Sequence, residues 1–243
     1  MPTVRLDKIL AAQSMTSRKD IKALIRSGTV KVNSIVAKNA DMQIDCDIDE
    51  VFVKGEKISL DEKIYIMMNK PSGVVSATED TKFPTVVDIL PESLKRKGLF
   101  PAGRLDKDTL GFVLITNDGE FAHNILSPKK HVEKTYIAKL DKKIEEDIVC
   151  EFLKGVDIGG GDICLPAKLN IIENSDIPIV EVKIKQGMYH QIKRMFLSYG
   201  YKVIYLKRTQ IGQLILDNNL SEGEARQITK DELAKVTKII NDN

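Results

Sequence analysis

The chain has little of what metal centres and disulfide scaffolds need. Its three cysteines, Cys46, Cys150 and Cys164, are scattered over 243 residues without the paired spacing of a zinc site. An odd and sparse set also argues against a disulfide framework, so we expect ordinary buried or half-buried thiols. The chain has only three histidines, and none is paired with another at metal-ligand spacing. We therefore expect neither a metal site nor a disulfide.

Long apolar runs are missing as well. No stretch is apolar enough to span a bilayer, and the N-terminal run MPTVRLDKIL lacks the apolar core of a signal peptide. We therefore expect a cytoplasmic protein without a membrane partner. The length suits a small module followed by a larger domain, and nothing in the sequence demands more than a monomer.

Positive charge is concentrated in two stretches, although the net charge is only +2. Residues 1–40 hold eight basic and two acidic side chains, and residues 182–208 hold seven basic side chains and no acid. Two basic islands on a nearly neutral chain suggest a polyanionic partner. Solvated surface would give the same pattern, so charge alone does not decide the function.

The first 60 residues alternate between short helical and strand-like patterns. Residues 5–12 place Leu6, Ile9 and Leu10 on one side of a helix. A second helix is expected over 18–26, with Ser17 as its N-cap. The remaining expected features are a helix stop at Gly28, a strand over 29–33, a turn at Asn33-Ser34 and a strand over 50–54.

This order of elements resembles the S4 RNA-binding domain. The matching residues are 5–8, 17–18 and 25–33. The resemblance implies that the second helix and the following turn face RNA. Basic side chains at near-helical spacing there suit phosphate contacts. The expected RNA-binding residues of this module are Arg5, Arg18, Lys19, Lys22 and Arg26.

The rest of the chain mixes strands and helices without strict alternation. This predicts an α+β domain with a mixed, largely antiparallel sheet flanked by helices, so we divide the chain into domains 1–60 and 64–240. Expected strands cover 64–70, 111–116, 135–140, 169–172 and 179–185, and expected helices cover 120–126, 144–153, 189–199 and 231–240. The glycine run at 159–162 is most simply a hairpin turn, since no phosphate-loop ending follows it.

The strongest local signal is the run GRLDKDTLG at 103–111, followed by an apolar stretch and TNDG at 116–119. It places Asp106 in a polar loop before an apolar strand, which is typical of a catalytic side chain. Residues 106–109 also spell D-x-D-x-T, the nucleophile motif of phosphotransfer enzymes of the haloacid dehalogenase type. That motif needs a buried strand before it, but FPAGR at 100–104 favours a loop. We therefore disfavour the phosphotransfer reading.

Three motifs in order resemble the RsuA group of pseudouridine synthases. They are the run at 103–119, EKTY at 133–136 and QGMYHQIKRMF at 186–196. Residues 211–214 and 223–229 resemble the C-terminal signatures of this group. Leu110 and Gln186 depart from the residues that are common there, but neither is a candidate site residue. The resemblance implies an RNA-modifying isomerase that needs no cofactor and no metal.

The resemblance also implies roles for individual residues. Asp106 would be the catalytic carboxylate, and Lys193 would keep it ionised, with Arg194 as the fallback. Tyr136 would offer a ring to stack on uracil and a hydroxyl for proton handling. Arg104 would help to hold a nucleotide extruded from its helix.

His190 and Gln191 are expected to contact RNA. His190 is a less suitable catalyst, because the reaction needs no group that titrates near neutrality. Each assignment has a plainer alternative. Asp106 would be a turn residue, Tyr136 a core residue and Lys193 part of a solvated helix face.

The motifs specify the reaction more narrowly than the substrate. The S4 module and YHQIKRM resemble most the small-subunit branch, which modifies one uridine of 16S ribosomal RNA, either naked or within an assembling 30S particle. Enzymes that act on 23S ribosomal RNA share the same motifs. A non-catalytic ribosomal RNA-binding assembly factor is the alternative from another class, although a binder has no need of Asp106, Tyr136 and Lys193 together.

Overall fold

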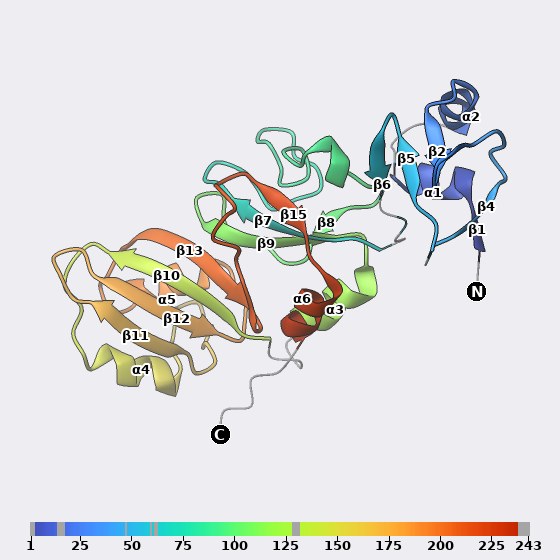
Figure 1. The fold of residues 1–243 in the computed structure, drawn as a ribbon. Helices are drawn as coiled ribbons and strands as arrows, with labels where there is room; N and C mark the ends of the chain where they lie inside the picture. Colours follow the sequence, from blue (N-terminus) through green and yellow to red (C-terminus); the bar gives the residue numbers. More distant parts are fainter. Residues whose placement is uncertain are drawn as a thin grey trace.

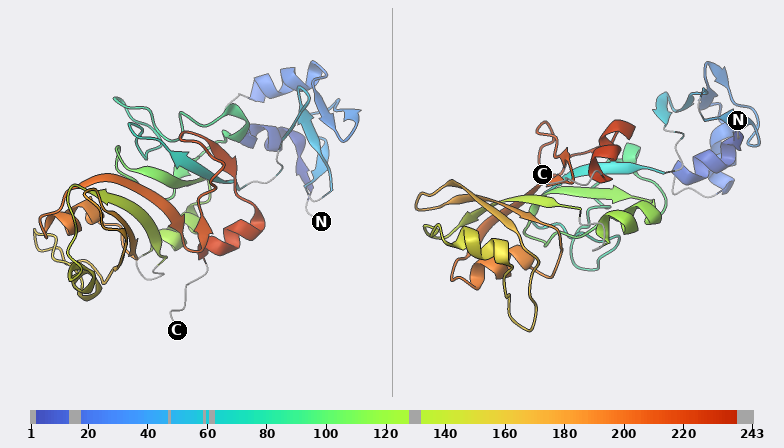
Figure 2. Two further views of the ribbon diagram at one scale, coloured as in Figure 1. Left: turned by 60° about the vertical axis from the view of Figure 1, so that its left-hand side comes forward. Right: turned by 90° about the horizontal axis from the view of Figure 1, so that it is seen from below.

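The computed structural model describes residues 3–13, 18–46, 48–58, 60, 63–127 and 132–237. A small N-terminal module lies beside a longer body that is built on one curved sheet (Figure 1). Figure 2 shows from two further directions that the module projects from one end of the body. The α+β fold with a largely antiparallel sheet is confirmed. No helix in the described part of the chain is long and apolar enough to cross a membrane.

The N-terminal module packs two helices against small sheets. Helix α1 (Leu6–Gln13) buries Leu6, Ile9 and Leu10, as the sequence predicts. Helix α2 (Arg18–Arg26) has the predicted bounds, whereas the predicted cap at Ser17 lies outside the described residues. β1 (Thr3–Arg5) pairs with β4 (Gln43–Asp45), and a second sheet has the order β3 (Ile35–Val36), β2 (Val30–Val32), β5 (Val51–Val53) and β6 (Glu56–Ile58).

The body is organised around a sheet in which, among the described residues, only one pair of neighbouring strands is parallel. Its order is β11 (Lys168–Glu173), β12 (Ile179–Ile184), β10 (Lys134–Leu140), β13 (Val203–Ile211), β9 (Leu110–Thr116), β7 (Tyr65–Lys70) and β15 (Ala225–Gln227). β8 (Phe100–Pro101) also pairs with β9, and β14 (Leu214–Ile215) with β13. The parallel pair, β13 and β9, joins the two halves of the sheet.

Gly111 makes this junction between β9 and β13 possible. It pairs with Arg208 across the junction and has a φ of 97°. A Cβ at this position would lie 2.2 Å from the carbonyl oxygen of Arg208. Glycine is therefore required both by the backbone conformation and by the close approach of the two strands.

Two apolar clusters lie on opposite faces of the central strands, because successive strand residues point to opposite sides. Met67 and Leu114 belong to the cluster that is covered by α3 (Gly119–Leu126) and α6 (Lys230–Thr237). Met68 and Val113 belong to the other cluster, which extends to α4 (Ile148–Lys154) and α5 (Gln191–Leu197). The short 3-10 helix η1 (Glu92–Leu94) lies in the long segment between β7 and β8.

Asp118 is the N-cap of helix α3. Its carboxylate accepts hydrogen bonds from Phe121 N at 3.1 Å and from the Tyr65 hydroxyl at 2.7 Å, and Lys63 Nζ lies 2.9 Å away. Burial opposes the charge of Asp118, but these three partners outweigh it and lower its pKa to about 2. The helix start is thus fixed by a carboxylate that stays ionised.

Some predicted elements differ in extent. Helix α4 begins at Ile148 instead of residue 144, α5 is shorter than predicted at both ends, and α6 is described only to Thr237. The glycine run at 159–162 forms the predicted hairpin turn, closed by the antiparallel bridge between Asp157 and Ile163. Strand β13 was not predicted, although it lies in the middle of the sheet.

Candidate active site

The loop over 102–109 carries Asp106 and enters strand β9. Leu105 is buried, and its backbone N–H donates to Ser76 Oγ at 3.1 Å. Thr109 is buried as well, and its N–H donates to the carbonyl oxygen of Asp106 at 3.1 Å. Between these two anchors the Asp106 side chain remains 26% exposed. The loop therefore presents a fixed carboxylate that substrate can reach.

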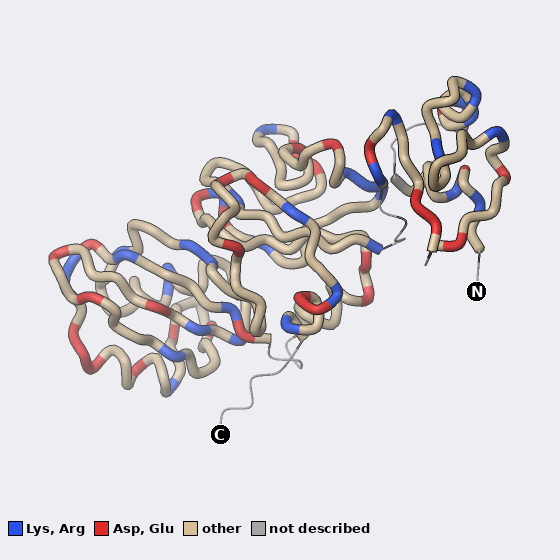
Figure 3. The backbone as a smooth tube through the Cα atoms, viewed as in Figure 1, with Lys and Arg blue, Asp and Glu red and all other residues tan. Residues whose placement is uncertain are grey.

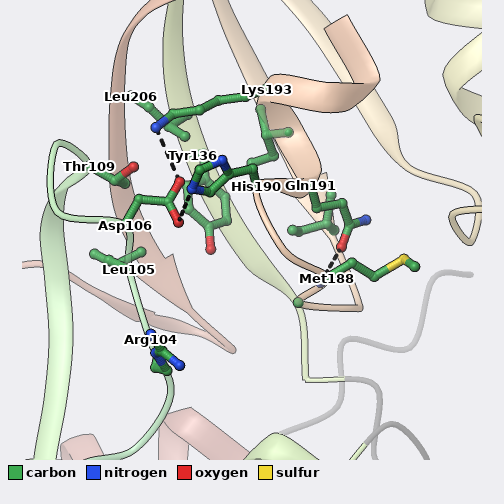
Figure 4. A pocket seen from close by; sticks show the side chains of 13 residues that line it. Arg104, Leu105, Asp106, Thr109, Tyr136, Met188, His190, Gln191, Lys193 and Leu206 are labelled. Carbon is green, nitrogen blue, oxygen red and sulfur yellow. Dashed lines mark hydrogen bonds and ion pairs between the residues drawn. The ribbon is translucent and has the colours of Figure 1, made fainter. Parts of the chain in front are cut away.

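Asp106 lies in a small network of charges (Figure 4). Lys193 Nζ from α5 is 3.1 Å from Asp106 Oδ2 and 2.6 Å from Asp108 Oδ1. Burial of Lys193 opposes its charge, but hydrogen bonds to Asp108 and Asp106 raise its pKa above the ordinary lysine value. The Nε2 atom of His190 is 3.5 Å from Asp106 Oδ1. The structure thus brings the predicted aspartate and lysine together, and it adds Asp108.

Tyr136 forms the apolar wall behind this network. It lies on β10, is only 7% exposed, and faces the same pocket as Asp106 (Figure 4). Ile184 from β12 and Leu206 from β13 line the pocket beside it. A pocket lined by an aromatic ring and a carboxylate suits a planar, uncharged ring attached to a sugar.

Lys70 is a residue that the sequence analysis missed. It is fully buried, and its ammonium donates to the carbonyl oxygens of Pro71 (2.9 Å), Lys107 (3.0 Å) and Thr109 (2.8 Å). Burial is the main reason that its pKa is lowered to about 8. Two of these carbonyls belong to the loop that carries Asp106, so Lys70 ties this loop to strand β7. Its place at the end of an apolar strand was the available signal.

Arg208 is a second residue that was missed. It is 4% exposed, and its Nε donates to the Phe112 carbonyl oxygen at 2.7 Å. Its Nη1 lies 3.4 Å from the Tyr136 hydroxyl, to which it donates a weak hydrogen bond. Arg208 therefore joins the parallel strands and also holds the hydroxyl end of Tyr136. The sequence pattern around Arg208 indicates neither its contact with strand β9 nor its contact with Tyr136.

The other residues predicted to act at this site have different surroundings from one another. Arg104 is exposed and lines the pocket. Gln191 is buried, and its side-chain oxygen accepts from Met188 N at 3.0 Å, so it stabilises the turn. Arg194 does not reach Asp106. It forms an ion pair with Asp162 at 3.1 Å and is not the fallback cation for the carboxylate.

Helix α2 of the N-terminal module is rich in Lys and Arg, which are blue on the backbone tube of Figure 3. Lys19, Lys22 and Arg26 are exposed, in agreement with a phosphate-binding surface. Arg5 is exposed too, but its guanidinium binds the Asp7 carboxylate at 2.8 and 3.1 Å. The side chain of Arg18 lies outside the described residues.

The basic stretch over 182–208 does not form one surface for a polyanion. Arg208 is buried, and Lys193 pairs with the two aspartates of the loop. Arg194 pairs with Asp162, and Lys183 lies 3.3 Å from Glu181. Four of the seven basic residues in this stretch thus already have protein partners, so the free positive charge here is smaller than the sequence suggests.

The surroundings of Asp106 also bear on the phosphotransfer alternative. The nucleophile of a haloacid dehalogenase type enzyme comes directly after a buried strand. Here the preceding strand, β8, has two residues, and a loop lies between it and Asp106. Asp106 and Asp108 instead share Lys193. The fold and the site thus define an enzyme whose carboxylate, paired with a lysine, faces an aromatic-walled pocket, preceded by a small basic module.

Comparison with known protein families identifies the family of this enzyme. The family described as RNA pseudouridylate synthase matches residues 64–198, and the S4 domain matches residues 4–47. The chain therefore belongs to the RNA pseudouridylate synthase family, with an S4 domain ahead of the catalytic region.

Relatives match over almost the whole chain. An uncharacterized RNA pseudouridine synthase of Bacillus subtilis, YtzG, is 47% identical over 231 residues, covering 95% of this chain and 97% of that protein. The ribosomal small subunit pseudouridine synthase A of Escherichia coli is 38% identical and covers 96% of this chain and 100% of its own. A crystal structure of a pseudouridylate synthase has a TM-score of 0.67 at 38% identity, covering 96% of this chain and 99% of that one. The resemblance to the RsuA group is confirmed.

Proposed function

We propose that this enzyme converts one uridine of small-subunit (16S) ribosomal RNA to pseudouridine, with Asp106 as its catalytic carboxylate. The observation that carries the assignment is the ion pair of Asp106 with Lys193, 3.1 Å apart, in the lining of the same pocket as Tyr136. The relatives named ribosomal small subunit pseudouridine synthase A, from Haemophilus influenzae and Escherichia coli among others, support the choice of 16S RNA.

The chemistry explains why the site needs a carboxylate. The bond between uracil nitrogen 1 and ribose carbon 1′ breaks, which builds positive charge on the sugar. Ionised Asp106 stabilises this charge or attacks carbon 1′. The base then turns, uracil carbon 5 bonds to carbon 1′, and the hydrogen on carbon 5 leaves as a proton while nitrogen 1 gains one. The product is an isomer of the substrate, so no redox partner is consumed.

Neighbouring side chains supply the remaining requirements. Lys193 places its positive charge 3.1 Å from the Asp106 carboxylate. Tyr136 offers its ring as the surface on which uracil turns and its hydroxyl for the proton on carbon 5. Arg104, at the pocket edge, binds the phosphate of the extruded nucleotide.

The S4 domain supplies affinity rather than chemistry. Within residues 1–60, the exposed Lys19, Lys22 and Arg26 contact phosphates in a way that does not depend on sequence. Residues 64–240 then select the uridine by the shape of an unpaired RNA segment. Binding should therefore weaken with salt for any RNA, whereas turnover should depend on the substrate.

Tritium release from RNA labelled at uracil carbon 5 tests this function, because forming the new bond expels that hydrogen. We expect release from 16S RNA, tested naked and with assembly proteins, and no effect of EDTA. Release only from 23S RNA would keep the reaction and change the substrate. Tight binding to either RNA without release would support a non-catalytic assembly factor instead.

A further inference from the structure

Tyr189 is an exposed aromatic residue next to the active site, and nothing in the reaction described above uses it. Its side chain is 76% exposed. The ring stacks on the His190 imidazole, with centroids 3.9 Å apart and planes 17° apart. His190 in turn approaches Asp106 to 3.5 Å. The outer face of the Tyr189 ring therefore lies one stacked ring beyond the catalytic carboxylate.

Contacts with the Tyr189 carbonyl oxygen and the conformation of the next residue hold Tyr189 in this position. Arg194 Nη1 lies 3.4 Å from the Tyr189 carbonyl oxygen, and its guanidinium is anchored by Asp162 at 3.1 Å and by the Gly159 carbonyl oxygen at 2.8 Å. His190 has a φ of 48° and a ψ of 33°, a left-handed conformation that is uncommon outside glycine. Such strain persists only where the surroundings enforce it. The exposed ring is thus presented by a fixed turn and is not merely a loose surface side chain.

A groove extends from Asp106 past this turn. It is lined by residues 187–190, by residues 72–73 and 75–77, by Asp80 and by the loop at 104–108. Arg104 and Lys107 contribute positive charge to a lining that also holds Asp80, Asp106 and Asp108, and Lys107 Nζ lies over the Phe83 ring at 3.2 Å. Aromatic rings beside basic side chains are the combination with which proteins bind unpaired RNA.

We propose that the outer face of Tyr189 stacks on the base of a nucleotide adjacent to the target uridine. This inference rests on the proposed function, because it requires the target nucleotide at Asp106. A nucleotide bound there is covalently linked to its two neighbours, so one flanking base comes within reach of the groove. Arg104 and Lys107 take the phosphates of the same strand, and stacking tolerates any base because every base has a flat face.

The test combines variants of Tyr189 with RNA that lacks a flanking base. The probe is a synthetic 16S RNA fragment centred on the uridine that the wild-type enzyme modifies, made intact and with an abasic residue on its 5′ or 3′ side. Tyr189→Leu should lower kcat/KM on intact RNA by about 10-fold, and Tyr189→Phe, which keeps the ring, should restore it. On RNA abasic at one of the two sides, wild type and Tyr189→Leu should become equal.

Leu197→Ala serves as the control, because Leu197 is 65% exposed on helix α5, which follows the Tyr189 turn, and lines neither the pocket nor the groove. Its kcat/KM should match wild type on every RNA. The stacking proposal is overturned if Tyr189→Leu turns over intact RNA like wild type. It is also overturned if the deficit of Tyr189→Leu relative to wild type is as large on both abasic RNAs as on intact RNA. If the wild-type enzyme modifies no uridine at all, the proposed function fails and the stacking fails with it, which sets this outcome apart.

Discussion

Replacing Lys70 with methionine should slow turnover by about 100-fold while leaving the protein folded. The Lys70 ammonium donates to two carbonyl oxygens of the Asp106 loop, those of Lys107 and Thr109, and to that of Pro71. Methionine keeps much of the volume but offers no donor. The loop then loses its tie to β7, and a displacement of about 1 Å at a reacting group costs about 100-fold in rate.

The stability of the Lys70→Met variant should change less than the loss of three hydrogen bonds suggests. Each buried carbonyl left without a partner costs about 1–3 kcal/mol. Methionine also removes a buried charge, whose desolvation is the main reason that the pKa of Lys70 is lowered to about 8. These effects oppose each other, so we expect the free energy of unfolding to fall by about 2 kcal/mol, which leaves a protein of ordinary stability folded.

Single-turnover tritium release and urea denaturation measure the two effects of Lys70→Met. Met67→Ala is the matched control, because Met67 is fully buried in the same strand but faces the opposite cluster. It should lose about 2–5 kcal/mol of stability and keep the wild-type rate while it is folded. A wild-type rate in Lys70→Met would refute the idea that this lysine positions Asp106.

Three further predictions concern other contacts. Lys193→Met should slow turnover more than Asp108→Asn, because Lys193 alone of the two contacts Asp106; equal rates on the same RNA would contradict this. The lowered pKa of Asp118 implies stability that is present above about pH 4 and lost as the pH falls toward 2, so urea unfolding should show Asp118→Asn about 2 kcal/mol less stable near neutrality and equal near pH 2. Gly111→Ala should fail to fold, because its methyl group would overlap the Arg208 carbonyl; a cooperative unfolding transition in this variant would disprove that packing argument.

The parts of the fold that follow from local pattern could be predicted. Helix α2 has the predicted bounds because an apolar face repeats at helical spacing and Gly28 follows it with a φ of 72°. Strand β9 has a continuous apolar run that only a strand buried on both faces would carry. In both cases the residues that decide the structure are neighbours in the sequence.

Strand β13 could not be predicted in the same way. Its side chains alternate only weakly between buried and exposed, and it contains Lys207, Arg208 and Gln210. The burial of Arg208 depends on the Phe112 carbonyl, 96 residues away in the sequence. From sequence alone such a charged residue is predicted to lie on the surface, because its burial requires a partner that the sequence does not identify.

The candidate site was predictable to a similar extent. Asp106, Tyr136 and Lys193 were chosen from motifs, and the structure places all three around one pocket. Arg194 was a poor alternative because adjacent helical residues point in directions about 100° apart, and it faces the hairpin with Asp162 instead. The contacts of Lys70 with the loop join strands that are distant in the sequence, so no local pattern contains them.

The central claim is that Asp106 performs the chemistry, and Asp106→Asn tests it most directly. Asp108→Asn is the matched control, because it makes the same change two residues along the loop and removes the other partner of Lys193. Each variant is measured for binding to 16S RNA and for tritium release from the same RNA. We expect Asp106→Asn to bind like wild type and release no tritium, while Asp108→Asn still releases it. Sustained release by Asp106→Asn would show that another group is the catalyst.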